Sequence, residues 1–385
     1  MNKDKFPLHK FNSIETPFYY YDIELLDQTI EAIKTQIEGK PFHVHYALKA
    51  NTNKRLLQHI AKQGFGADCV SGNEILKAIE NGFNPNEIAF AGVGKTDKEI
   101  EIALANDIFS FNVESIPELH AINTLAKAKN KIANIALRIN PNVDAQTHSY
   151  ITTGLNENKF GLEEANIPEV LELLPSLTSL KLTGLHFHIG SQITELSSFK
   201  NLCNKINDLQ TYFESKEIGF DHINVGGGLG IDYENPDKYP IADFSNYFKL
   251  FSSHLKLREG QKLHFELGRS VVAQCGSLIS RVTYLKKGIK KDFVILDAGM
   301  TDLIRPALYQ AFHHIENLTS DKGKCPYDIV GPICESSDTF AKNFKINQTQ
   351  RGDIIAICSA GAYGEVMASQ YNCREIAKSY FSDTI

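Results

Sequence analysis

Two spacings of apolar residues alternate along the first 270 positions of the chain. Short runs rich in β-branched and aromatic residues predict strands, and longer stretches with apolar residues every three or four positions predict amphipathic helices. The strands are expected at 42–48, 66–69, 87–91, 108–113, 133–139, 181–187, 221–225 and 262–266. The helices are expected near 22–36, 54–63, 73–81, 97–105, 116–128, 163–174, 195–215 and 242–258.

Three of these helices open with a Ser/Thr-x-x-Glu pattern, which predicts a capping box. In that motif the hydroxyl and the carboxylate accept hydrogen bonds from amides of the first turn. The pairs are Ser71/Glu74, Thr96/Glu99 and Ser115/Glu118.

The alternation of eight strands with helices favours a (β/α)8 barrel over an open sheet, and the length of about 250 residues suits one barrel. We expect the barrel over residues 25–270. Beyond it, short β-like runs at 271–282, 293–298, 327–330 and 353–358 predict a mostly-β domain over 271–385. Residues 1–24, with a strand at 17–22, are assigned to that second domain. The connection 140–162 is long enough to suggest a functional loop.

Composition narrows the class of protein. The 385 residues are 42% hydrophobic and 22% charged with a net charge of −6, which is ordinary for a soluble globular chain. No basic stripe predicts nucleic-acid binding, and no apolar run predicts a secretory signal or a membrane span. Seven scattered cysteines without a Cys-x-x-Cys pair predict reduced thiols and a cytoplasmic location.

Unusual residues follow the predicted barrel strands at their carboxyl ends, which form the active-site face of a barrel. Lys49 lies at the carboxyl end of the first predicted barrel strand. It is either a solvated lysine or a desolvated one, whose lowered pKa would make the amine nucleophilic. The strand ends carry Lys49, Asp68, His186-Phe-His-Ile-Gly-Ser-Gln192, Gly226-Gly-Gly-Leu-Gly230 and Glu266-Leu-Gly-Arg269.

Each of these features has a structural and a functional interpretation. The glycines are either a tight turn or a phosphate site, since the last barrel loops commonly bind phosphate. His188 is either a core histidine or a ring against a flat cofactor. Glu266 needs a cationic partner, which is either Arg269 or a protonated ring nitrogen. A lysine, a phosphate loop, a flat histidine and a carboxylate together describe a pyridoxal phosphate site.

The same motifs resemble the fold-type III pyridoxal-phosphate decarboxylases over essentially the whole chain. Tyr46-Ala-Leu-Lys-Ala-Asn51, His188-Ile-Gly-Ser-Gln192 and Gly226–Gly230 resemble the lysine motif, the stacking-histidine motif and the phosphate loop of that family. Leu267 replaces the proline of the family's Glu-Pro-Gly-Arg, which is expected to loosen the turn. The resemblance implies an alanine racemase-like barrel that binds pyridoxal 5'-phosphate through Lys49, Asp68, His188, Ser191, Gly226, Gly227, Gly228, Glu266, Gly268, Arg269 and Tyr363.

Three stretches of the second domain extend the resemblance. They are Arg305-Pro-Ala-Leu-Tyr309, Cys334-Glu335-Ser336 and Gly361-Ala-Tyr363-Gly364, which resemble the substrate clamp, the acid-thiol segment and the cofactor-contacting tyrosine segment. In the family the cysteine segment completes the site of a partner subunit, which implies a homodimer with shared active sites. Cys334 or Lys49 would return the final proton, and the sequence leaves both open.

The resemblance also implies an amino-acid substrate, meso-2,6-diaminopimelate, decarboxylated at its D-centre to L-lysine in the last step of lysine biosynthesis. The non-reacting end of that molecule needs a cation for its carboxylate and an anion for its ammonium group. Arg269 and Arg305 can supply the first, and Glu335 the second. Tyr309 and Tyr363 complete the expected substrate-binding set.

Three alternatives remain at this level. A related decarboxylase could act on carboxynorspermidine, ornithine or arginine. A metal-dependent barrel hydrolase could use His43-x-His45 and His186-x-His188, since alternate strand residues share a face. A non-catalytic homologue could serve as a binding partner, although the retained Lys49, Arg305 and Cys334 argue against it.

Overall fold

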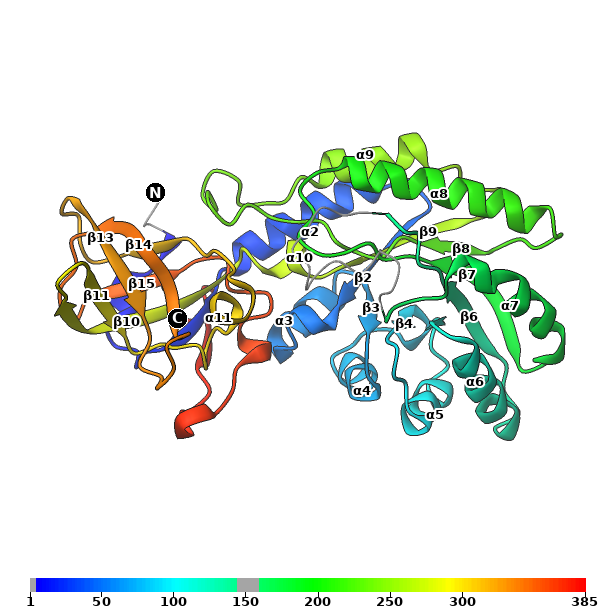
Figure 1. Cartoon of the computed structure of the whole chain (residues 1–385), viewed down its shortest axis with the longest axis horizontal. Helices are drawn as coiled ribbons and strands as arrows, with labels where there is room; N and C mark the ends of the chain where they lie inside the picture. Colours follow the sequence, from blue (N-terminus) through cyan, green and yellow to red (C-terminus); the bar gives the residue numbers. More distant parts are fainter. Residues whose placement is uncertain (1–4, 144–158) are drawn as a thin grey trace. The chain divides into compact units, whose positions relative to one another are not determined.

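The computed structural model describes residues 5–143 and 159–385 and divides into two compact units (Figure 1). The barrel unit comprises Ile30–Gly230 and Asp243–Gly268. The β unit comprises Met1–Thr29, Ile231–Ala242 and Arg269–Ile385. Residues 231–242, which lie inside the range expected for the barrel, therefore belong to the β unit.

The predicted barrel is confirmed. Eight parallel strands close on themselves, because the first also pairs with the last, with His45 opposite Glu266. Each strand lies within two residues of its predicted bounds. The strands are β2 (Phe42–Ala47), β3 (Gly66–Cys69), β4 (Ile88–Phe90), β5 (Ser110–Val113), β6 (Ala133–Arg138), β7 (Leu180–His186), β8 (His222–Asn224) and β9 (Lys262–Leu267).

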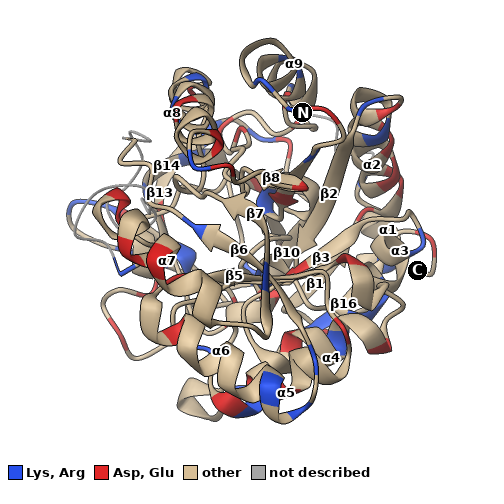
Figure 2. Cartoon of the chain, turned by 90° about the vertical axis from the view of Figure 1, so that its right-hand side faces the viewer, with Lys and Arg blue, Asp and Glu red and all other residues tan. Residues whose placement is uncertain are grey.

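Helices surround the barrel and turn their charged residues outward (Figure 2). Their inner faces carry the expected apolar residues; in α3, for example, Leu56, Leu57 and Ile60 are buried. The helices are α2 (Ile23–Ile37), α3 (Lys54–Ala61), α4 (Gly72–Glu80), α5 (Asp97–Ala105), α6 (Ile116–Ala128), α7 (Ile167–Leu173), α8 (Ser197–Glu214) and α9 (Phe244–His254).

One of the three predicted capping boxes is complete. The hydroxyl of Thr96 accepts from the amide of Glu99, whose carboxylate accepts from the amide of Thr96. Ser71 and Ser115 cap their helices, but the prediction for their glutamates was wrong, since each carboxylate accepts from the amide before the cap. The bonds are Val70 N to Glu74 Oε2 (2.7 Å) and Glu114 N to Glu118 Oε2 (2.8 Å).

Aromatic and imidazole rings fill the interior of the barrel towards the amino-terminal ends of its strands. His45 and Phe109 each stack on His264, with ring centroids 5.0 and 4.8 Å apart, and His222 lies 4.7 Å from Phe109. His45 Nε2 lies 2.7 Å from His264 Nδ1, and His45 Nδ1 donates to the carbonyl oxygen of Glu87 across 2.9 Å. The three histidines are 2–4% exposed.

The β unit contains an eight-stranded sheet that includes the amino-terminal strand, as predicted. β1 (Phe18–Tyr21) pairs with β10 and with β16 (Lys378–Phe381). The sequence missed β12, β14 and β16, which carry many polar residues. The main path runs β12 (Ile315–Asn317), β15 (Ile354–Ile357), β10 (Gly276–Lys287), β11 (Asp292–Leu296), β13 (Lys324–Val330) and β14 (Thr339–Asn347), and the short helices are α1 (Leu8–Phe11), α10 (Arg269–Val272) and α11 (Arg305–Tyr309).

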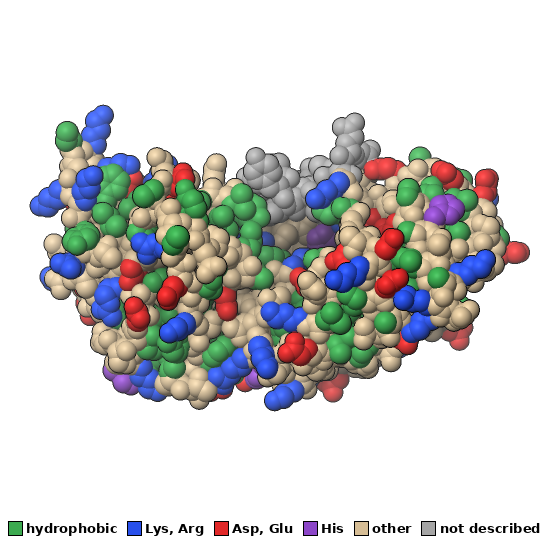
Figure 3. Space-filling view, turned by 90° about the horizontal axis from the view of Figure 1, so that it is seen from below, with side chains coloured by type: hydrophobic (Ala, Val, Ile, Leu, Met, Phe, Trp, Pro, Cys, Tyr) green, Lys and Arg blue, Asp and Glu red, His purple; other side chains and the backbone are tan. Residues whose placement is uncertain are grey.

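Acidic and basic side chains are interspersed on the face shown in Figure 3. Within the described ranges, no helix has the length and apolar character needed to cross a bilayer. Most of the long connection 140–162 lies outside the described residues, so the expectation of a functional loop there stays a prediction. Its described ends pair with β6, where Leu162 N donates to Arg138 O across 2.8 Å.

Candidate active site

Lys49 lies in a single 3-10 turn, Leu48–Ala50, that follows β2 directly. Leu48 and Ala50 are buried, so this turn is fixed at the carboxyl end of the strand. The next helix, α3, is capped by Asn53, whose side chain accepts from the amide of Arg55. The side chain of Lys49 is 38% exposed. The desolvated environment considered for this lysine stays a prediction.

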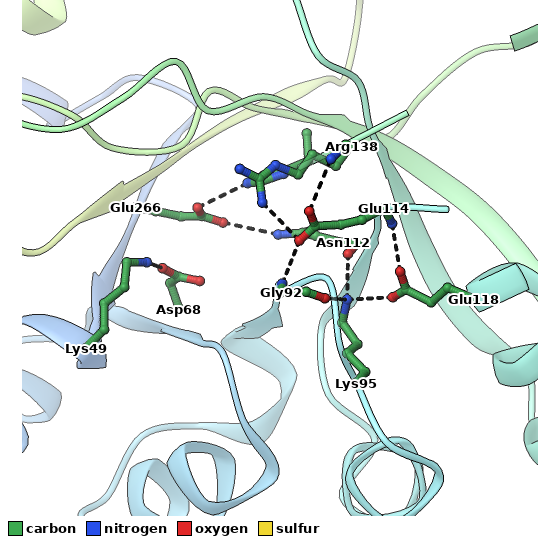
Figure 4. A network of polar contacts seen from close by, with 11 residues as sticks. Lys49, Asp68, Gly92, Lys95, Asn112, Glu114, Glu118, Arg138 and Glu266 are labelled. Carbon is green, nitrogen blue, oxygen red and sulfur yellow. Dashed lines mark hydrogen bonds and ion pairs between the residues drawn. The ribbon is translucent and has the colours of Figure 1, made fainter. Parts of the chain in front are cut away.

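The amine of Lys49 is held by an ion pair with the adjacent strand. Its Nζ lies 2.6 Å from Oδ2 of Asp68 at the end of β3 (Figure 4). Asp68 is completely buried, and both burial and the charge of Glu266 raise the pKa of its carboxyl group, against the opposing effect of Lys49. The pair therefore fixes the position of the lysine amine on the barrel face.

Glu266, near the end of β9, accepts hydrogen bonds from three side chains. His186 Nε2 lies 3.1 Å from Oε2, and the amide nitrogens of Asn112 and Asn224 lie 3.2 and 2.8 Å from Oε1. Burial would raise the pKa of Glu266, but the effects of His186 and Lys49 outweigh it and hold the pKa well below its usual range. Glu266 is therefore an anion without Arg269 as its partner.

Sequence reasoning missed the two asparagines. Asn112 ends the run Ser-Phe-Asn in β5, and Asn224 ends His-Ile-Asn in β8. Each is a buried polar residue in a short strand. Asn112 stands in a mostly apolar run and could have been found as Glu266 was, whereas β8 (His-Ile-Asn) offers no apolar background against which Asn224 would stand out.

The loops after β7 and β8 are joined to each other. The amide of Gly227 donates to His188 Nδ1 across 3.2 Å, and the amide of Ile193 donates to Gly228 O across 2.8 Å. Burial and the charge of Arg138 lower the pKa of His188 well below its usual value, so its ring is neutral. A Cβ on Gly227 would lie 2.0 Å from the carbonyl oxygen of Glu266, so only glycine fits there.

The Glu-Leu-Gly-Arg stretch is held firmly where it leaves the barrel. Leu267 pairs with Tyr46 in the sheet and is 1% exposed, and the expected loosening at this position stays a prediction. A Cβ on Gly268 would lie 3.0 and 3.1 Å from the Cβ atoms of Ala50 and Ala47. Glycine therefore allows the strand end to pack closely against the residues that flank Lys49. Ser191 is half-buried in the loop after β7.

A second polar network lies at the ends of β4, β5 and β6 (Figure 4). Arg138 NH1 lies 2.9 Å from Glu114 Oε1, and both residues are buried. The carboxylate of Glu114 also accepts from the amides of Gly92 (2.7 Å) and Gly161 (3.2 Å). Glu114 thereby ties three loops to one buried ion pair. A neighbouring buried pair joins Lys95 Nζ to Glu118 Oε1 at 2.5 Å.

Within the β unit, Arg269 and Arg305 both contact a tyrosine that sequence reasoning missed. Arg269 NH1 donates to the Tyr233 hydroxyl across 2.7 Å, and Arg305 Cζ lies 4.9 Å from the Tyr233 ring centroid. Burial raises the pKa of Tyr233, but the two guanidinium charges outweigh it and lower the pKa. Arg269 also lies over Tyr363, 4.9 Å from its ring centroid. Burial lowers the pKa of Arg269, but Tyr233, Tyr363 and Tyr309 outweigh it and raise the pKa.

Arg305, at the start of α11, is 6% exposed. Its NH1 lies 2.7 Å from Nε2 of His313, which sequence reasoning also missed. Across the two described ranges of the chain, no carboxylate lies within ion-pair distance of Arg305. This buried cation is therefore supported by neutral groups.

Cys334 and Glu335 lie between β13 and β14 and are exposed in the single chain. The amide of Cys334 donates to Asn372 Oδ1 across 3.3 Å, and the hydroxyl of Tyr371 donates to Glu335 Oε1 across 2.8 Å. The bonds of Arg305 include neither residue, so the structure does not join the predicted acid-thiol segment to this arginine within the β unit.

The two histidine pairs that suggested a metal site have separate partners. His45 bonds to His264 and to the Glu87 carbonyl, whereas His186 bonds to Glu266. No group of three His, Cys, Asp or Glu side chains in the described residues could hold a metal ion.

Comparison with known proteins identifies the class of protein to which this site belongs. The family model described as the pyridoxal binding domain of pyridoxal-dependent decarboxylases matches residues 24–273. The chain belongs to the family of pyridoxal-dependent decarboxylases.

The relatives narrow this class further. A diaminopimelate decarboxylase of Bacteroides thetaiotaomicron is 57% identical over 384 residues, covering 100% of both chains. The crystal structure of diaminopimelate decarboxylase from Helicobacter pylori complexed with L-lysine is 41% identical, with a TM-score of 0.92 over 97% of this chain and 93% of that one. These similarities place the chain among the diaminopimelate decarboxylases. A viral arginine decarboxylase from Paramecium bursaria Chlorella virus, 21% identical with a TM-score of 0.87, shares the fold.

Proposed function

We propose that the protein decarboxylates meso-2,6-diaminopimelate at its D-centre, giving L-lysine and CO2, with pyridoxal 5'-phosphate as cofactor. The observation that carries the proposal is Glu266. A carboxylate has about four acceptor positions, and His186, Asn112 and Asn224 occupy three of them. One position remains on a buried anion for a protonated ring nitrogen, on the same strand-end face as Lys49.

The other barrel residues fit the same cofactor. Lys49 would hold its aldehyde end, and the loop Gly226–Gly228, with Ser191, would hold its phosphate. The neutral ring of His188 would lie against its flat face. When bound, pyridoxal phosphate supplies an electron sink for the pair left behind by the departing CO2. Glu266 favours this chemistry because its negative charge keeps a proton on the ring nitrogen.

The substrate would be held by charge at its non-reacting end. Arg305 is a buried cation supported by neutral groups, which suits it to bind a carboxylate by paired hydrogen bonds. Arg269, Tyr309 and Tyr363 are proposed as further contacts, and Glu335 as the partner of the substrate ammonium group. A decarboxylase of ornithine or arginine would not need the carboxylate contact.

Cys334 and Glu335 are proposed to act in the site of a second copy, so that the working enzyme is a homodimer. Their exposure in the single chain supports this proposal, as does the 49% exposure of Tyr371, whose hydroxyl bonds to Glu335. Cys334 or Lys49 would then return a proton to the carbon that has lost CO2. The seven free cysteines support a cytoplasmic location.

Cofactor attachment and substrate choice test the activity. Borohydride reduction of the purified protein should fix the cofactor covalently to Lys49, as read by peptide mapping. A carbon dioxide assay should give turnover with meso-diaminopimelate and little with the LL and DD isomers, ornithine or arginine. A label on another residue would overturn the assignment of Lys49, and faster turnover of ornithine or arginine would overturn the substrate.

Mixing two inactive variants tests the shared site. Lys49→Ala homodimers and Cys334→Ala/Glu335→Ala homodimers, which lack both side chains proposed to act in the partner's site, should each have little activity. Random reassembly should restore roughly a quarter of the native value, because half the dimers then contain one intact site. Either variant alone, diluted and reassembled in the same way, is the control. Mixtures that stay as inactive as their parents would contradict the shared site.

A further inference from the structure

The ring of His313 has one protonation state that fits its two hydrogen bonds. The carbonyl oxygen of Cys358 can only accept, so the proton lies on Nδ1, 2.9 Å away. Arg305 NH1 can only donate, so Nε2, 2.7 Å away, carries a lone pair. The ring is therefore neutral, which agrees with a pKa lowered to about 3 by burial and by Arg305. His313 is a fixed acceptor that orients one nitrogen of Arg305.

Tyr233 contacts the same guanidinium group through its ring. Its ring centroid lies 4.9 Å from Arg305 Cζ and 5.1 Å from the His313 ring, at an interplanar angle of 77°. The hydroxyl of Tyr233 accepts from Arg269 across 2.7 Å. One side chain thus contacts both arginines, and Arg305 is held by a hydrogen bond to His313 and by the ring of Tyr233.

This arrangement differs from an ordinary buried ion pair, because the supports of Arg305 are a neutral imidazole and a phenol ring. A carboxylate partner would fix Arg305 equally well but would cancel its charge. Neutral acceptors fix the direction of the guanidinium plane and leave the positive charge for a ligand. His313 accepts from one of the five N–H donors of Arg305. A paired contact with a ligand carboxylate requires two more donors in one plane.

We propose that His313 and Tyr233 are positioning residues that orient Arg305 for the carboxylate at the non-reacting end of the substrate, and so help to select a dicarboxylic substrate. The proposal rests on the proposed function, because it takes Arg305 as the group that binds this carboxylate. Neither side chain needs to touch the substrate for this role.

Two substitutions at position 313 separate positioning from general support. His313→Leu removes the acceptor, whereas His313→Gln keeps an amide oxygen that can accept from Arg305. His313→Leu should raise the KM for meso-diaminopimelate by about tenfold or more, the expected cost of one hydrogen bond to a charged group. The kcat and the cofactor absorbance should change little, and His313→Gln should recover most of the KM. His314→Leu is the matched control, because His314 bonds to Glu234 O instead, and its KM should stay at the native value.

Tyr233→Leu removes the ring beside Arg305 together with the hydroxyl that binds Arg269, whereas Tyr233→Phe removes the hydroxyl alone. The KM should rise more in Tyr233→Leu than in Tyr233→Phe, and this difference measures what the ring contributes to Arg305. The comparison also carries the test if His313→Leu does not fold. Arg305→Gln separates the two levels of the proposal. An unchanged KM in Arg305→Gln would overturn the carboxylate contact itself. A raised KM in Arg305→Gln, with a native KM in His313→Leu and the same KM in Tyr233→Leu as in Tyr233→Phe, would overturn the positioning role alone. Loss of cofactor absorbance together with kcat in His313→Leu, unrelieved by His313→Gln, would show a structural role and would also overturn it.

Discussion

The two units of this protein hold a buried arginine in different ways. In the barrel unit, Arg138 pairs with Glu114. In the β unit, Arg305 is as buried as Arg138, at 6% exposed, but its supports are His313 and Tyr233. Arg138 is compensated by the chain itself, whereas Arg305 is oriented without being neutralised.

The difference indicates which charges build structure and which are available to a ligand. A buried charge is costly unless it is paired, so a compensated pair needs no further partner. A buried cation held by neutral acceptors keeps its attraction for an anion, and the binding of that anion compensates the positive charge. Glu266 is the anionic counterpart in the barrel unit, because its three donors leave one acceptor position for a ligand proton.

The largest effect is expected when the negative charge of Glu266 is removed. Glu266→Gln keeps the shape of the side chain but loses its charge, so the ring nitrogen of the cofactor would no longer be held protonated. We expect kcat to fall by about 100- to 1,000-fold, the range for loss of one electrostatic or acid–base contribution. Steady-state kinetics measures this. The matched control, Asn112→Ala, removes one donor to the same carboxylate and should cost much less. A near-native kcat in Glu266→Gln would refute the role of its charge.

The next largest effect tests a compensated pair. Glu114→Leu leaves Arg138 buried without its carboxylate and should lower the free energy of unfolding by about 3–5 kcal/mol. The double variant Glu114→Leu/Arg138→Met removes both charges and should recover most of that loss. Urea unfolding gives both values. Equal stability of the single variant and the native protein would show that this pair does not hold the loops at Gly92 and Gly161.

Most of the fold was predictable because it depends on local periodicity. The barrel strands alternate with helices whose apolar spacing and capping residues are visible in the sequence, and each strand end marks the active-site face. Strands β12, β14 and β16 were missed because their many polar residues, such as Lys342, Asn343 and Lys345 in β14, hide the alternation. Their pairing is set by neighbouring strands in the folded sheet.

The site was predictable only in part, for a related reason. Lys49 and Glu266 are unusual in their own segments, so the sequence alone marks them. Tyr233 and His313 are ordinary residues in irregular segments, and they gain meaning only because the fold of the β unit brings them to Arg305. A tertiary contact between segments distant in the chain leaves no local pattern.

The histidines inside the barrel give a pH dependence of stability. Burial lowers the pKa of His45 to about 4 and of His222 to about 3, and that of His264 well below its usual value. Below about pH 6.5 the unfolded chain protonates these rings while the folded barrel keeps them neutral. The unfolded state therefore binds more protons, and stability falls as the pH drops from about 6.5 to 4, by up to about 1.4 kcal/mol per pH unit for each ring.

Urea unfolding at a series of pH values between 7.5 and 5 measures this slope. Other groups also act on these rings. The Glu87 carbonyl and Glu266 raise the pKa of His45 against the effect of burial, and Lys262 further lowers the pKa of His264. His222→Phe should reduce the slope of the unfolding free energy against pH by about the contribution of one histidine, because phenylalanine cannot take up a proton. A slope unchanged by that substitution would show that His222 does not contribute.

The smallest effect is expected where a compensated pair lies in water. Lys181 and Asp221 are 3.8 Å apart with side chains 63% and 72% exposed, so the solvent already stabilises each charge. Lys181→Met should change the free energy of unfolding by about 0.5 kcal/mol or less, and added salt should reduce even that. Set against Glu114→Leu, this result would show that burial, and not the presence of a partner, makes a pair structurally important. A loss as large as that of Glu114→Leu would remove this distinction, and with it the reason for treating Arg305 as a cation held for a ligand.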